Sequence, residues 1–236
     1  MDRIFFELCA ETVKAAIAGA RGGANRIELC EKLVCGGVTP SMELIQAASQ
    51  SLTIPLHILI RPRAGDFVYS ASEFALMRRQ IEFAKMAGAS GIVVGVLLPN
   101  SRVDVIRCRE LVELARPMTV VFHRAFDETR NLHEALEDVI ETGADNLLTS
   151  GGAGNILLGA EQIAELQRLA GTRLHIVAGG GLRLDNLIEF VHRAGVFSLH
   201  GSLSRRNGEL LPKPCLSDLE SDTRQVIQLL SSEYHK

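Results

Sequence analysis

Several paired motifs that mark common metal and redox sites are missing from this 236-residue sequence. Its five cysteines, at positions 9, 30, 35, 108 and 215, are scattered without a C-x-x-C spacing. The sequence contains neither an H-x-H nor an H-E-x-x-H pair. Zinc-finger, thioredoxin-like and histidine-rich zinc sites are therefore not indicated. The odd cysteine count instead predicts free thiols in a reducing compartment.

Long apolar runs and a strong charge of either sign are also missing. No run approaches the roughly 18 residues that a membrane span needs. The formal net charge is only -3, which gives no general attraction to nucleic acid or to an anionic membrane. The first residues, MDRIFFELC, lack the basic head and the apolar stretch of a signal peptide. We therefore expect a cytoplasmic protein with neither a nucleic-acid nor a membrane partner.

What the sequence does contain is a regular succession of apolar, strand-like runs. Their starts are about two to three dozen residues apart, which is the length of one strand plus one crossover helix. The eight predicted strands cover residues 4–9, 26–30, 56–60, 91–96, 119–123, 146–150, 174–179 and 196–200. Their continuous apolar character indicates a parallel sheet that is buried on both faces.

Helical patterns fill the gaps between these runs. Residues 70–88 begin with a capping-box spacing, Ser70 to Glu73, and several of the other patterns end at glycine. Eight strand–helix units predict an α/β fold of the closed (β/α)₈ type, a TIM barrel, as one domain over residues 1–236. Residues 205–218 are predicted to form a longer loop before the last helix.

Charged residues and histidines close several of the predicted strands directly. In a barrel, the carboxyl ends of the strands form the working face, so these residues are candidates for a shared site. The candidate catalytic cluster comprises Glu7, Glu28, Arg61, Arg63, Asp66, His123, Arg124, Asp127 and His200. None of the five lysines closes a strand, which argues against a Schiff-base aldolase. The alternative is a structural layer of ion pairs that locks the barrel rim, made of Glu7, Arg26, Glu28, Arg61 and Arg124.

Two glycine-rich loops follow the sixth and seventh strands. Their backbone N–H groups could hold an anion, with arginine side chains as bidentate partners. The predicted anion-binding residues are Ser150, Gly151, Gly152, Gly179 and Gly180. Tight turns explain such glycines about equally well.

The stretch LIRPRAGDF places two arginines at the end of an apolar strand. Such charges are costly there unless they are paired. We expect Arg61 and Arg63 to face the carboxylates of Glu7 and Glu28 and a ligand.

The tripeptide Glu-Leu-Cys ends both of the first two strands. Each cysteine shares a strand face with the glutamate two residues earlier, and neighbouring strands lie about 4.8 Å apart. If the two tripeptides end in register, Cys9 and Cys30 meet at the rim. Two thiolates without harder ligands favour a soft ion such as copper(I).

Taken together, the motifs GGANRIELC, GGVTPS, IRPRAGDFVYS, FHRAFD, LTSGG and AGGG resemble the CutC copper-homeostasis family, from about residue 4 to 205. The resemblance implies a TIM barrel, a cytoplasmic location and a homodimer or higher homo-oligomer. It also implies a link to copper, with Cys9 and Cys30 as the metal ligands. Ala64 departs from the family pattern, and its conformation tests whether that loop needs a positive φ at this position.

Three functions stay open at this point. The first is copper(I) binding through Cys9 and Cys30. The second is an enzyme of unknown reaction that acts on a small anionic substrate, for example a phosphorylated one, at the Glu/Arg/His rim. The third is a structural or interaction protein whose rim charges serve stability alone.

Overall fold

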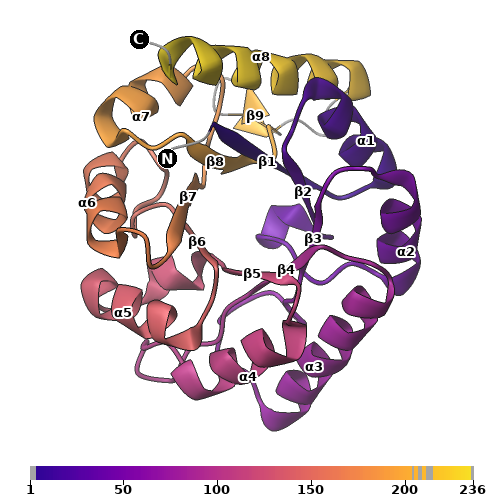
Figure 1. Cartoon of the computed structure of the whole chain (residues 1–236), viewed down its shortest axis with the longest axis vertical. Helices are drawn as coiled ribbons and strands as arrows, with labels where there is room; N and C mark the ends of the chain where they lie inside the picture. The colour runs from indigo at the N-terminus through magenta and orange to yellow at the C-terminus, as the bar shows by residue number, and fades with distance from the viewer. Residues whose placement is uncertain (1–3, 204, 207–208, 211–214, 235–236) are drawn as a thin grey trace.

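Eight parallel strands close into one barrel, and helices surround it (Figure 1). The structure is a computed structural model that describes residues 4–203, 205–206, 209–210 and 215–234. The strands follow chain order around the barrel, and β1 pairs with β8 to close it. The predicted TIM barrel is confirmed.

The element bounds agree with the predicted strands to within two residues at nearly every end. The barrel strands are β1 (Phe5–Ala10), β2 (Arg26–Leu29), β3 (Leu56–Leu59), β4 (Gly91–Val94), β5 (Thr119–Phe122), β6 (Asn146–Thr149), β7 (His175–Gly179) and β8 (Ser198–Gly201). The helices are α1 (Val13–Gly22), η1 (Leu33–Cys35), α2 (Met42–Ser51), α3 (Ala71–Met86), α4 (Val105–Ala115), η2 (Arg124–Glu128), α5 (Leu132–Thr142), α6 (Ala160–Ala170), α7 (Leu187–Ala194) and α8 (Leu216–Tyr234).

Local sequence signals fix where the helices begin and end. The predicted capping box of α3 is present, because Ser70 accepts the Glu73 N–H and Glu73 accepts the Ser70 N–H. Helices α1 and α5 end at Gly23 and Gly143, whose φ values are 99° and 79°. This left-handed conformation suits glycine because it has no Cβ.

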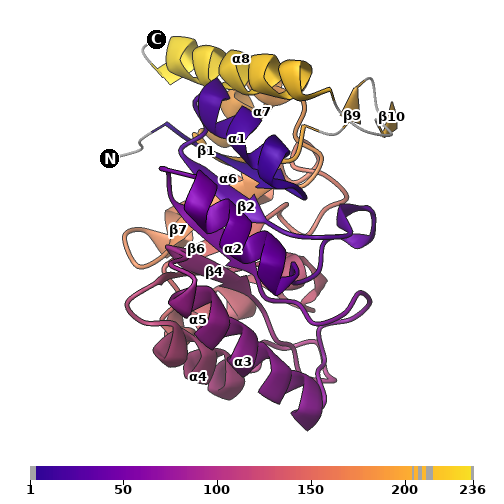
Figure 2. The same ribbon diagram turned by 90° about the vertical axis from the view of Figure 1, so that its right-hand side faces the viewer.

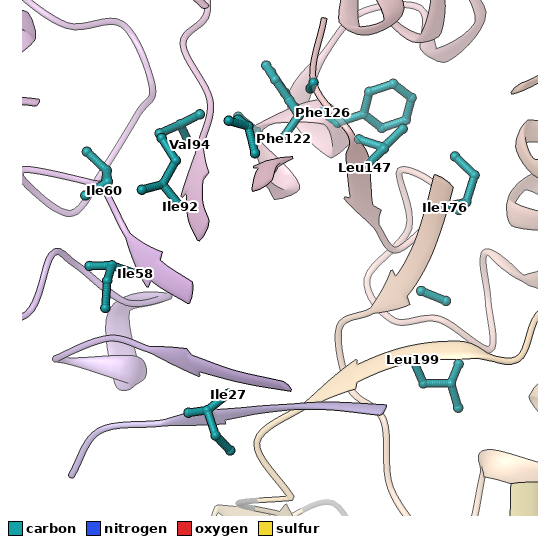
Figure 3. Packing of buried hydrophobic residues seen from close by; sticks show 14 of the residues in the cluster. Ile27, Ile58, Ile60, Ile92, Val94, Phe122, Phe126, Leu147, Ile176 and Leu199 are labelled. Atoms are coloured by element: carbon teal, nitrogen blue, oxygen red, sulfur yellow. The ribbon is translucent and has the colours of Figure 1, made fainter. Parts of the chain in front are cut away.

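Residues that alternate along each strand form two separate layers. One set, which includes the strand residues labelled in Figure 3, lies around the ring of strands and belongs to the large core between the sheet and the helices. The other set faces the barrel interior, where an apolar plug separates the two ends. The plug consists of Cys9, Cys30, Leu59, Val93, Val121, Leu148 and Val177. Glu7, Glu28, His57 and His200 have the same strand parity as the plug, so they also point inward.

The region before the last helix is partly described. A short antiparallel pair, β9 (Arg205–Arg206) and β10 (Glu209–Leu210), lies within the predicted loop 205–218 and projects beyond the start of α8 (Figure 2). The rest of that loop before Cys215 lies outside the described residues. No helix in the described ranges is long and apolar enough to cross a membrane.

Gly91 on β4 provides a test of interior packing. A Cβ built there would lie 2.3 Å from Nε2 of His57, so the imidazole fills the space that a side chain would take. We expect Gly91→Ala to lower the free energy of unfolding by about 1–3 kcal/mol through overpacking. Urea denaturation would measure this. The control, Gly154→Ala, has nothing within 4 Å of its added Cβ and should change stability by less than about 0.5 kcal/mol. Equal stabilities of the two variants would contradict the packing.

Candidate functional site

A buried carboxylate, Glu7, lies at the centre of a polar group inside the barrel. Strand register places it opposite Arg26 on β2 and opposite His200 on β8. Its Oε2 forms an ion pair with Nε of Arg26, and its Oε1 is 2.7 Å from Nδ1 of His200. Glu7 is fully buried and Arg26 is 7% exposed. One network of charged side chains therefore links the first, second and eighth strands of the barrel.

The neighbours of Glu7 control its ionisation. Burial alone would raise its pKa, but the charges of Arg26 and His200 hold the pKa well below its usual value of 4.5. Burial likewise disfavours the charged form of His200, yet Glu28 and Glu7 raise the pKa of this imidazole above 6.5. Glu7 is thus an interior anion at neutral pH, and it favours a protonated His200.

Glu28 connects this network to two thiols. Its Oε2 is 4.0 Å from Nδ1 of His200, and its Oε1 is 3.6 Å from the Cys9 sulfur. The Cys9 and Cys30 sulfurs are 3.3 Å apart. Both cysteines are free and buried, with exposures of 5% and 0%. A continuous path of polar atoms therefore runs from Arg26 to Cys30.

The pKa values of Glu28 and Cys9 are both raised, which favours their protonated forms. Burial raises the pKa of Glu28 to about 7, although His200 counteracts this. The pKa of the Cys9 thiol is raised well above 9.0, first by the hydrogen bond with Cys30 and then by burial. Both effects disfavour the anionic forms, so Cys9 is a thiol rather than a thiolate in the metal-free protein.

The register that brings the thiols together differs from the expected one. Cys9 lies opposite Glu28, so the two Glu-Leu-Cys tripeptides are offset by two residues instead of ending in register. The sulfurs meet diagonally across the two strands. The same offset places Glu28 between Cys9 and His200, and ligand atoms of these three residues lie within 4.8 Å of one another. This trio, with Cys30 beside it, could hold a metal ion.

Arg61 forms contacts that differ from those expected. Its guanidinium donates to the carbonyl oxygens of Cys35, Gly37 and Gly65 at 3.1, 3.0 and 2.7 Å. The expectation that it faces Glu7 and Glu28 is therefore wrong. In this buried position, three carbonyls and the Phe67 ring, 4.7 Å from the guanidinium carbon, surround the charge. Its Nε has no hydrogen-bond partner among the described residues.

Arg63 and Asp66 lie outside the interior cluster. Arg63 binds Glu73 at the start of α3, at 2.6 Å, and Asp66 at 2.8 Å, and it stacks on Tyr69. These contacts shape the loop between β3 and α3. The positive φ in that loop is at Gly65, 94°, so Ala64 fits there without left-handed strain.

His123 is a neutral, buried imidazole at the end of β5. Its Nδ1 accepts the Ala125 N–H at 3.2 Å, and its ring is 4.9 Å from that of Phe67. Burial, together with the charge of Arg61, lowers its pKa to about 3. Because Nδ1 is an acceptor, Nε2 carries the proton. This donor has no partner among the described residues.

The glycine loop after β6 already holds a carboxylate of the chain itself. Asp127 accepts the N–H groups of Ser150 and Gly152 at 3.0 Å, and it pairs with Nε of Arg124 at 2.8 Å. Gly151 donates to the Thr149 hydroxyl. Asp127 thus occupies the positions that we assigned to a ligand anion. Arg124 is held above this loop, half-exposed, and it also donates to the Ser150 hydroxyl at 3.0 Å.

The loop after β7 brings Gly179 and Gly180 close to two of the predicted site residues. A Cβ at Gly179 would lie 3.0 Å from Cβ of His200, and one at Gly180 would lie 3.0 Å from the guanidinium carbon of Arg124. These glycines make room for the two side chains. Their role in anion binding stays a prediction.

Sequence reasoning left Arg26 and His57 out of the candidate site. Arg26 was named only in the alternative ion-pair layer, yet it stands two residues before Glu28 and shares its strand face, a spacing that could have placed it in the site. His57 is buried next to Glu28 in the register, and its Nδ1 has no partner among the described residues. Burial and the charge of Arg26 lower its pKa to about 3.

Comparisons with known proteins identify the family of this chain. Residues 4–205 match the CutC family. The chain belongs to this family. A CutC family protein from Chromobacterium violaceum is 45% identical over 202 residues, which is 86% of this chain and 81% of that protein. The copper homeostasis protein cutC homolog of Mus musculus is 41% identical over 83% of this chain and 72% of its own length.

A solved structure shows the same fold in another family member. The crystal structure of CutC from Streptococcus agalactiae superposes with a TM-score of 0.80 at 29% sequence identity. The match covers 85% of this chain and 99% of that one. The family match over residues 4–205 includes every residue of the polar cluster.

The Glu7–Arg26 pair generates a stability prediction. We expect Glu7→Gln to lower the free energy of unfolding at pH 7 by about 3 kcal/mol, because it leaves the Arg26 charge buried without its partner. Glu137→Gln, which breaks the exposed pair with Arg173, is the control and should leave the free energy of unfolding nearly unchanged. Urea denaturation of the three proteins would measure the difference.

The pH dependence of that loss follows from the lowered pKa of Glu7. The stabilisation is present above the unfolded-state value of 4.5, and it is lost as pH falls toward the lower folded-state pKa. The difference between wild type and Glu7→Gln should therefore widen as pH falls from 7 to 5, because Glu7 also raises the pKa of His200, and then shrink in stronger acid. A loss at pH 7 no larger than that of the control would contradict the buried ion pair.

Proposed function

We propose that this CutC family member binds copper(I) through Cys9 and Cys30. The observation that carries the proposal is the pair of free thiols, 3.3 Å apart and buried in the mouth of the barrel. Soft sulfur ligands select copper(I) over hard cations. The name of the mouse relative, a copper homeostasis protein homolog, supports the same ion.

The donor set around the thiols fits such an ion. His200 offers an imidazole nitrogen, a ligand type that suits copper, within 4.8 Å of the Cys9 sulfur, and the Glu28 carboxylate lies beside them. Because ligand thiols must lose their protons, metal binding releases protons and weakens in acid. The raised pKa of Cys9 makes this release costly in the metal-free protein. The Glu28 oxygen beside the Cys9 sulfur is placed to accept the proton.

The setting of the protein is part of the proposal. All five cysteines are free, which suits a reducing compartment such as the cytoplasm. The family resemblance also implies a homodimer or higher homo-oligomer. Neither the location nor the assembly is needed for copper binding at the thiol pair.

Competition for copper(I) against a chromogenic chelator, under anaerobic reducing conditions, tests the proposal. The parent protein should carry Cys35→Ser and Cys215→Ser, because these two exposed thiols would also compete for the ion. We expect the parent to bind one copper(I) per chain. Adding Cys9→Ser or Cys30→Ser should weaken the affinity by more than about 100-fold, since loss of even an outer-shell partner costs up to that factor.

The matched control removes a buried thiol from elsewhere. Cys108 on α4 is 1% exposed and donates to the Val96 carbonyl at 3.6 Å. Adding Cys108→Ala to the parent should leave copper(I) affinity unchanged. Unaltered competition in a variant that lacks both Cys9 and Cys30 would disprove the proposed function.

A second candidate function is an enzyme that acts on a small anionic substrate, such as a phosphorylated one. Two buried donors at the strand ends, Nε of Arg61 and Nε2 of His123, have no partner among the described residues. The half-exposed Arg124 adds a cation, and Glu7, Glu28 and His200 could handle protons. This function does not require Cys9 or Cys30, which distinguishes it from copper binding.

A further inference from the structure

The proposed copper ligands are almost completely shielded from solvent. Cys30 is 0% exposed and Cys9 is 5% exposed. A metal ion, or a donor that delivers one, needs a path to these sulfurs. Some part of the chain therefore has to move before the thiols can be loaded.

The segment after β2 covers the sulfur pair. Leu33 in this segment packs against the apolar plug that contains both cysteines. Gly37 approaches even more closely, because a Cβ built on it would lie 2.7 Å from Cδ2 of Leu59 and 3.6 Å from the Cys30 sulfur. Its φ of 85° and its lack of a side chain let the backbone lie directly against Cys30.

The same segment is shaped as a loop with a narrow neck. Residues 31 and 38 pair as an antiparallel bridge, with N–H to carbonyl distances of 3.0 and 2.7 Å. Between them, Lys32, Gly36 and Gly37 all have positive φ values. At the tip, Val34 is 84% exposed. The loop beyond the neck is thus a compact unit that could swing as one piece.

One buried side chain holds this loop against the barrel. Two of the three carbonyls bound by Arg61, those of Cys35 and Gly37, belong to the loop. The third, Gly65, belongs to the neighbouring loop after β3. On the other side, the exposed Glu11 accepts the Leu33 N–H at 2.8 Å. Charged hydrogen bonds such as these are stronger than neutral ones.

We propose that residues 31–38 form a lid over Cys9 and Cys30, and that Arg61 is the latch that keeps the lid closed. The costly arginine at the end of β3 is then a positioning residue that acts on the thiols through the lid backbone. Opening the lid lets copper(I) reach the sulfurs. This role of the lid rests on the proposed function. The lid itself is a property of the metal-free chain.

Alkylation of the buried cysteines by iodoacetamide, followed by peptide mass spectrometry, tests the lid without any metal. The parent again carries Cys35→Ser and Cys215→Ser. Each charged hydrogen bond lost should favour opening by about tenfold, so Arg61→Gln should raise the alkylation rate of Cys30 at least about tenfold. Glu11→Ala, whose side chain is exposed, is a milder variant that should raise the rate by about two- to fivefold.

Two controls separate lid opening from general loss of stability. Cys108 on α4 lies outside the barrel and reports global unfolding in the same sample. Its alkylation should not increase in parallel with that of Cys30. Arg116→Gln removes an arginine that binds the Gly143 carbonyl and Asp145 at the opposite end of the barrel, and it should leave the Cys30 rate unchanged.

Two results would overturn the lid. One is a Cys30 rate that is unchanged in both Arg61→Gln and Glu11→Ala. The other is an equal rise for Cys30 and Cys108, which would mean that the whole barrel opens. Neither result bears on equilibrium copper(I) affinity, and a failure to bind copper(I) would leave the alkylation result standing. The two proposals can therefore fail separately.

Discussion

The structure of the site depends on a negative charge kept inside the barrel. Glu7 is fully buried, and its charge is tolerated because Arg26 and His200 contact its two oxygens. Strand register produces these contacts, since both partners lie directly opposite Glu7 on the adjacent strands. His200, held by Glu7, then faces Glu28, which contacts Cys9. The position of the thiol pair follows from this chain of contacts.

The polar residues at the strand ends serve different purposes, although they look alike in the sequence. Glu7 and Arg26 compensate each other's charge in the interior, and Asp127 organises the loop after β6 through its N–H groups. Arg61 ties two loops together through carbonyl oxygens. Several of these charged residues therefore stabilise the barrel, as the structural alternative predicted. This stabilising role coexists with a buried sulfur pair that such a rim does not require.

Much of the fold was predictable because apolar runs of similar length recur at the spacing of strand–helix units. The proximity of the two cysteines was also predictable. Each cysteine stands at the end of a strand, and these two strands are neighbours in a barrel. Their offset of two residues was not, because register depends on the shear of the closed sheet rather than on local sequence. The targets of Arg61 were missed for a related reason. Backbone carbonyls of a distant loop leave no signal in the identity of its residues.

The most direct test of this account is the ionisation of His200 in the metal-free protein, measured by NMR titration of its imidazole. If Glu7 is a buried anion in contact with Nδ1, His200 should titrate above 6.5 in the wild type, and Glu7→Gln should lower that pKa. A His200 that titrates at or below 6.5 in both proteins would show that the interior charge network does not exist as described.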